Sequence, residues 1–97
     1  MNRETVGRLW EVHKRVDWPR MSSDLEGPLM TLDTVISGCV VYFLDSQEGL
    51  DDQRRRILGD CLADLETIEP ELDEECLSYF QRLHELGALL LTMPPQA

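Results

Sequence analysis

The chain has 97 residues, the usual size of one domain, which leaves too little sequence for a second independent core. Hydrophobic residues make up 42% and charged residues 29% of it, a composition that excludes wholesale disorder. The formal net charge is −10. Such a chain is repelled by nucleic-acid phosphates and anionic lipid headgroups, so we expect no nucleic acid and no membrane among its partners.

The charge is unevenly distributed. The first 20 residues hold five basic and three acidic residues, whereas the remaining 77 hold four basic and 16 acidic ones. The N-terminal segment is therefore a basic element attached to an acidic body. A body of this kind favours a basic partner, although acidity also serves simply to keep a small domain soluble.

Three cysteines, Cys39, Cys61 and Cys76, form an odd set without close pairs. The first 20 residues carry charges throughout, unlike a secretory signal peptide. These features predict a reducing compartment, and we expect the protein in the cytoplasm. No uncharged run approaches the ~20 apolar residues of a membrane-spanning helix, which predicts a soluble protein.

Residues 2–17 place Val6, Leu9, Trp10, His13 and Val16 on one face of an amphipathic helix. Trp18-Pro19 should end this helix, because a residue before proline avoids the α conformation. Residues 20–28 contain serines, a glycine and a proline and are expected to form a loop or a mobile linker.

Residues 29–46 are rich in β-branched and aromatic residues, so residues 34–44 could form a buried strand. The spacing of Leu32, Val35, Ile36, Cys39 and Phe43 instead favours a helix, and the strand remains the alternative. Gly38 in its middle is unfavourable for a helix, so we expect it to allow close approach of another helix.

Two further helices are predicted. The first begins near Asp51 and runs to about residue 69, where Pro70 breaks it. The second is capped by Asp73 and runs to about residue 92. Their short connection predicts an antiparallel helical hairpin. The predicted fold class is therefore a single all-α domain, a small bundle of three to four helices built around this C-terminal hairpin, with residues 29–93 as helical core and 94–97 as a frayed tail.

The end of the last helix is apolar around nearly its whole circumference. Such a helix must be buried on more than one side, so it is either the central helix of the domain or a surface that meets another chain. In the second case we expect self-association through Leu86, Leu89, Leu90 and Met93.

No catalytic motif is recognisable. The glycines are scattered singly, without the spacing of a phosphate-binding loop, a dinucleotide site or a serine nucleophile elbow. The three cysteines and His84 have the residue types of a zinc site, but none of the close pairs that form half of one. Each cysteine lies on an apolar helix face, so we interpret all three as core residues. We expect no enzyme activity, no metal and no cofactor.

The most distinctive feature is an acidic block of eight acidic residues within residues 60–75, a stretch without a base. It consists of Asp60, Asp64, Glu66, Glu69, Glu71, Asp73, Glu74 and Glu75. Such a block can attract and orient a cationic partner, or it can serve only solvation and helix capping.

Two functional hypotheses follow. The first is a non-catalytic protein-protein interaction module that self-associates as a dimer or larger homo-oligomer. The second is an inhibitor that binds a basic protein, in the manner of an immunity protein or antitoxin that neutralises a nuclease. They differ in their response to salt, because screening slows association between charged surfaces and leaves apolar contacts intact.

Overall fold

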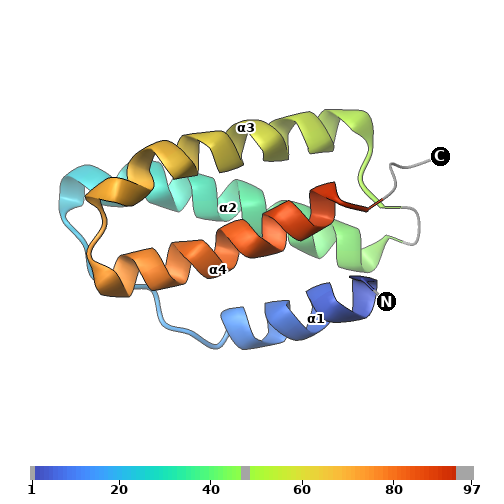
Figure 1. Ribbon diagram of the computed structural model, residues 1–97, viewed down its shortest axis with the longest axis horizontal. Coiled ribbons are helices and arrows are strands. Elements are labelled where there is room, and N and C mark those ends of the chain that lie inside the picture. Colours follow the sequence, from blue (N-terminus) through green and yellow to red (C-terminus); the bar gives the residue numbers. More distant parts are fainter. Residues whose placement is uncertain (1, 47–48, 94–97) are drawn as a thin grey trace.

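The computed structural model describes residues 2–46 and 49–93, and these ranges form four α-helices and one short 3-10 helix, without a strand. The α-helices are α1 (Asn2–His13), α2 (Ser23–Asp45), α3 (Asp52–Ile68) and α4 (Glu74–Leu91). The 3-10 helix η1 (Glu69–Glu71) joins α3 to α4, which run antiparallel (Figure 1). The predicted small all-α bundle with a C-terminal helical hairpin is confirmed.

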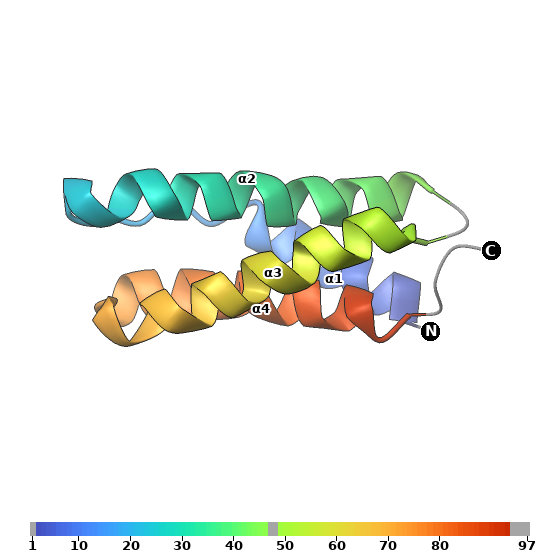
Figure 2. The ribbon, with the colours of Figure 1, turned by 90° about the horizontal axis from the view of Figure 1, so that it is seen from above.

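The helices form two layers. In Figure 1, α4 lies between α3 and α1, and Figure 2 shows α2 covering these three from one side. α4 packs against each of the other three helices, and its Phe80, Leu83 and Leu90 are fully buried. The sequence left open whether this helix is central or meets another chain, and in the structure α4 is the central helix of the bundle.

The residues predicted to mediate self-association lie in this core. Leu86, Leu90 and Met93 are buried, and Leu89 is half-buried against the same cluster. The three neighbouring helices already cover the second apolar face of α4. The residues predicted to mediate self-association thus lie inside the folded chain. Self-association stays a prediction, but these residues of α4 do not supply an exposed surface for it.

The close helix contact occurs at a different glycine from the predicted one. A Cβ atom at Gly38 would have no neighbour within 4 Å, so the expectation that another helix approaches there is wrong within this chain. A Cβ atom at Gly87 would lie 2.8 Å from Leu62 Cδ2 and 3.2 Å from Leu58 Cδ1. Gly87 is therefore a position of close contact between α3 and α4.

The second helix begins six residues earlier than predicted. Residues 23–28, expected to be loop, form the start of α2, with Pro28 inside the helix. Trp18 Nε1 donates to Glu26 Oε2 at 3.1 Å, and Leu29 is fully buried, so tertiary contacts hold this turn in place. The strand alternative for residues 34–44 is wrong, because the stripe predicted for a helix faces the core.

The first helix ends earlier than predicted. α1 stops at His13, and residues 14–16 continue as tighter turns, with Val16 N donating to the His13 carbonyl at 3.0 Å. Val16, expected on the apolar face, is exposed, whereas Pro19 is buried. The predicted cap at Asp73 is confirmed, since Asp73 accepts from Cys76 N, and the helix start predicted near Asp51 is capped by Asp51, which accepts from Arg54 N. The predicted frayed tail at 94–97 lies outside the described residues.

The two glycines give a matched test of this packing. We expect Gly87→Leu to lower the free energy of unfolding by about 1–3 kcal/mol, because the new side chain overpacks the α3–α4 contact. Gly38→Leu should raise it by about 0.5–1 kcal/mol through helix propensity alone. Urea unfolding of both variants measures the difference, and equal effects at the two positions would contradict the assignment of the close contact to Gly87.

Candidate functional site

The acidic block lies mainly at one end of the bundle. Seven of its eight residues are exposed and Glu69 is half-buried. Asp60, Asp64 and Glu66 lie on the second half of α3, Glu69 and Glu71 on η1, and the remaining three at the start of α4. In Figure 1 this is the end at which α3, η1 and α4 meet, opposite the N-terminus.

The fold adds the start of α2 to this end. A small hollow between the two segments is lined by Ser22 and Leu25 on one side and by Glu71 and Asp73 on the other. Cys76 Sγ donates to the Arg20 carbonyl at 3.0 Å and ties them together. Asp24 and Glu26, in the first turn of α2, therefore extend the acidic surface. We call Asp24, Glu26 and residues 66–75 together the acidic end.

Sequence reasoning missed Asp24 and Glu26 because it assigned residues 20–28 to a loop. The signal that could have found them is Ser23-Asp24-Leu25-Glu26, which has the spacing of a helix-capping box. The observed cap residue is Ser22, without a side-chain capping bond. A pattern search for helix starts would therefore have placed this turn within one residue.

The helix dipoles separate the acids of this end into two groups. Glu74 and Glu75 lie in the first turn of α4, where the partial positive charge of the helix terminus favours them. Glu66 and Glu69 lie at the C-terminal end of α3, where the partial charge is negative and the last turn holds no base. Helix capping therefore explains the first group. In the second group Glu66 has a partner in His84, and Glu69 has no ion pair among residues 2–46 and 49–93.

The basic residues of the opposite end are engaged within the chain. Arg3 donates to the Phe43 carbonyl at 2.7 Å and lies over the Phe43 ring. Arg55 donates to the carbonyls of Leu91 and Met93 at 3.0 and 3.1 Å. These arginines stabilise the C-terminal ends of α2 and α4. They are thus neither near the acidic end nor free to neutralise it.

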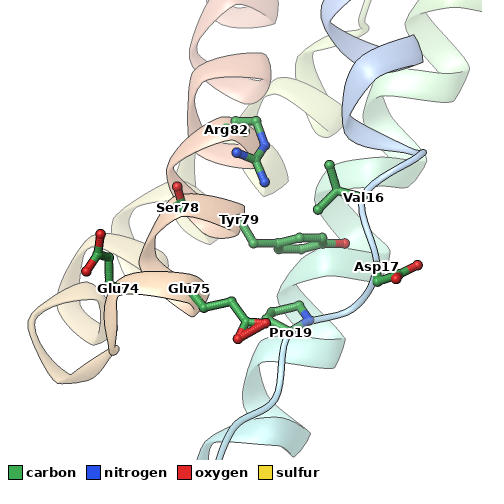
Figure 3. A pocket seen from close by; sticks show the side chains of 8 residues that line it. All are labelled: Val16, Asp17, Pro19, Glu74, Glu75, Ser78, Tyr79 and Arg82. Atoms are coloured by element: carbon green, nitrogen blue, oxygen red, sulfur yellow. The ribbon is translucent and has the colours of Figure 1, made fainter.

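A groove of about 660 Å³ adjoins the acidic end. Val16, Asp17 and Pro19 of the α1–α2 connection line one side, and a stripe of α4 lines the other (Figure 3). This stripe contains Glu74, Glu75, Ser78, Tyr79 and Arg82. Two members of the predicted acidic block, Glu74 and Glu75, therefore share a surface with Asp17, which lies far from them in the sequence.

The tyrosine of this groove is held rigidly. Tyr79 Oη donates to Asp33 Oδ1 at 3.0 Å, and its ring packs against His13, Trp18 and Phe80 with ring centroids 4.5 to 5.5 Å apart. Burial, together with the nearby Asp33 carboxyl, raises the pKa of the Tyr79 hydroxyl well above its ordinary value. Tyr79 is therefore a neutral hydrogen-bond donor and a fixed aromatic wall.

His13 lies directly behind this wall. It is only 3% exposed, and neither ring nitrogen has a hydrogen-bond partner in the part of the chain that the structure describes. Burial lowers the pKa of the imidazole, an effect that Asp33 opposes and Arg82 reinforces. Burial also raises the pKa of the Asp33 carboxyl, which the hydrogen bond from Tyr79 opposes. The neutral imidazole is thus the form that the fold accommodates.

The cysteines take the positions expected of small apolar residues. Cys39 and Cys76 are buried, Cys61 is half-buried, and burial raises the pKa of all three thiols. His84 lies elsewhere, with its Nε2 2.7 Å from Glu66 Oε2. Within residues 2–46 and 49–93, no three His, Cys, Asp or Glu residues converge in the manner of a metal site.

One helix is long and apolar enough to cross a membrane when judged by length and composition alone. This helix is α2, and about a third of its most apolar window is buried inside the bundle. Core helices of bundles pass the same test, and α2 packs on the other helices through residues such as Ile36, Val40 and Phe43. The cytoplasmic location stays a prediction.

No protein-family model matches this sequence, and no curated protein or solved structure is significantly similar to it. The arrangement of charges, the groove and the buried histidine are therefore the observations from which a function can be inferred.

The buried histidine makes stability depend on pH. Since the folded-state pKa of His13 is lowered, the unfolded chain binds a proton first as the pH falls below the ordinary histidine pKa of about 6.5. We expect stability to be constant above that pH and to fall below it, by up to about 1.4 kcal/mol per pH unit. Urea unfolding between pH 7.5 and 5.5 measures the slope.

His13→Leu should reduce this slope, and His84→Gln should leave it in place because His13 remains. The raised pKa of Asp33 acts in the opposite direction, so the difference between wild type and His13→Leu isolates the histidine. A slope that His13→Leu leaves unchanged would assign the pH dependence to other groups.

Proposed function

We propose that the chain is a non-catalytic protein-protein interaction module that binds a basic partner protein through its acidic end. The exposed carboxylates of α2, α3, η1 and α4 support this proposal, because they create a local negative field that speeds encounter with a cationic surface. An inhibitor that covers the nucleic-acid-binding surface of a nuclease is one form that such a module takes.

The observation that carries the proposal is the position of Glu69. Acids at a helix C-terminus oppose the helix dipole, typically at a cost of about 0.3–1 kcal/mol each. Glu66 Oε2 lies 2.7 Å from His84 Nε2, whereas Glu69, the C-terminal cap residue of α3, has no ion pair among residues 2–46 and 49–93. A carboxylate that opposes the helix dipole without such a partner is better explained by binding than by folding or capping.

Self-association of the module is favoured less. Three of the four side chains expected to mediate it fill the core between α4 and its neighbours. The acidic end would also repel a second copy of itself. These two observations support a heterologous basic partner over a homo-oligomer.

Glu69→Gln separates stability from binding. We expect this variant to unfold at higher urea, with a gain of about 0.3–1 kcal/mol, because a charge opposing the α3 dipole is removed. It should also bind a hexa-arginine peptide more weakly than wild type. Isothermal titration at 20 and 300 mM NaCl measures the affinity, which we expect to fall with salt.

Asp52→Asn is the matched control, since Asp52 is an exposed acid in the first turn of the same helix, at the opposite end of the bundle. It should lose stability by a similar amount and leave peptide binding nearly unchanged. If binding weakens equally in both variants, the affinity depends on the net charge of the protein and not on the position of Glu69. No detectable binding of the peptide to wild type at low salt would overturn the proposal.

A further inference from the structure

The groove beside Tyr79 has ends of opposite charge. Glu75 supplies a carboxylate at one end and Arg82 a guanidinium at the other, and the carboxylates of Glu74 and Asp17 lie to either side of Glu75 (Figure 3). Glu75 and Arg82 lie seven residues apart on α4, which is ~10 Å along the helix axis. At physiological salt this spacing is comparable with the Debye length of about 8 Å, so Arg82 weakens the attraction between Glu75 and a cation without cancelling it.

The carboxylates that line the groove form no ion pairs within the described part of the chain. Other surface charges form ion pairs, as Arg8 does with Glu4 and Lys14 with Glu11. Asp17, Glu74 and Glu75 form none among residues 2–46 and 49–93, and the buried Arg82 Nε has no hydrogen-bond partner there. The groove therefore offers unpaired carboxylates to a ligand.

The apolar lining suits the stem of a long basic side chain. Between the charged ends, Val16 is exposed and supplies the open apolar surface, whereas the Tyr79 ring shows only an edge and Pro19 is buried (Figure 3). Lysine and arginine pack their methylene groups along apolar surfaces while their charged heads reach polar groups. The hydrogen bond from Tyr79 to Asp33 keeps the ring in place, so little ordering is required when a ligand binds.

We propose that this groove receives an arginine or lysine side chain of the basic partner, with its stem on Val16 and the exposed edge of Tyr79 and its cation at Glu75. The inference rests on the proposed function and names the anchoring point within the larger acidic surface. Arg82 limits how far the cation enters and favours a carbonyl or carboxylate of the partner at its own end.

The test is titration of a ¹⁵N-labelled chain with hexa-arginine peptide, followed by NMR. We expect the largest amide shifts at residues 16–20 and 75–82. Glu75→Gln should weaken binding by about two- to fivefold, and Arg82→Gln should strengthen it by a similar factor. Asp60→Asn removes one negative charge on α3, away from the groove lining, and should change the affinity by less than Glu75→Gln.

The outcomes distinguish the two proposals. Shifts confined to α3 and η1, with equal effects of Glu75→Gln and Asp60→Asn, would overturn the groove and leave the acidic end as the binding surface. Absence of shifts anywhere at low salt would overturn both. Weaker binding in Arg82→Gln would contradict the placement of the cation beside Glu75, because it would show that Arg82 attracts a carbonyl or carboxylate of the peptide more strongly than it repels the cation.

Discussion

The close approach of α3 to α4 at Gly87 constrains the whole bundle. A Cβ atom at this position would lie 2.8–3.3 Å from the side-chain ends of Leu58 and Leu62, so a larger residue here requires these leucines to shift. Closure of the α3–α4 hairpin buries one side of α4 and leaves its other sides to α1 and α2, which is why a helix apolar all round is stable within one chain. It also brings the end of α3 beside the start of α4, and this juxtaposition gathers the acids at one end of the molecule.

The direction of each helix determines whether the charged residues at its ends agree with its dipole. α2 and α4 begin where Asp24, Glu74 and Glu75 lie, and Arg3 and Arg55 donate to carbonyls at their ends. The antiparallel α3 agrees with its dipole at its start, where Asp51 is the cap, and disagrees at its end. The exposed Asp45, the last residue of α2, also opposes its helix dipole, so this mismatch occurs at both ends of the bundle.

The connection between α1 and α2 links the groove to the core. Trp18 and Pro19 pack inward, Val16 and Asp17 face the groove, and His13 is enclosed behind Tyr79 without a hydrogen-bond partner among residues 2–46 and 49–93. The groove wall and the buried histidine thus share one aromatic cluster. Protonation of His13 would place a charge in that cluster, so the stability of the groove and the pH of the solution are coupled through the same residues.

The sequence by itself determined the fold class, the hairpin, the cap at Asp73 and the helix start near Asp51, because helical periodicity and capping are local properties. It also identified the acidic block, whose exposure follows from the cost of burying charge. Only the tertiary structure decided that Leu86, Leu90 and Met93 are core, that Gly87 and not Gly38 makes the tight contact, and that residues 23–28 are helical. Each of these depends on which surfaces meet across the chain. Periodicity shows that a face is apolar but not what covers it, and the groove between Asp17 and Glu75 exists only because two distant segments pack together.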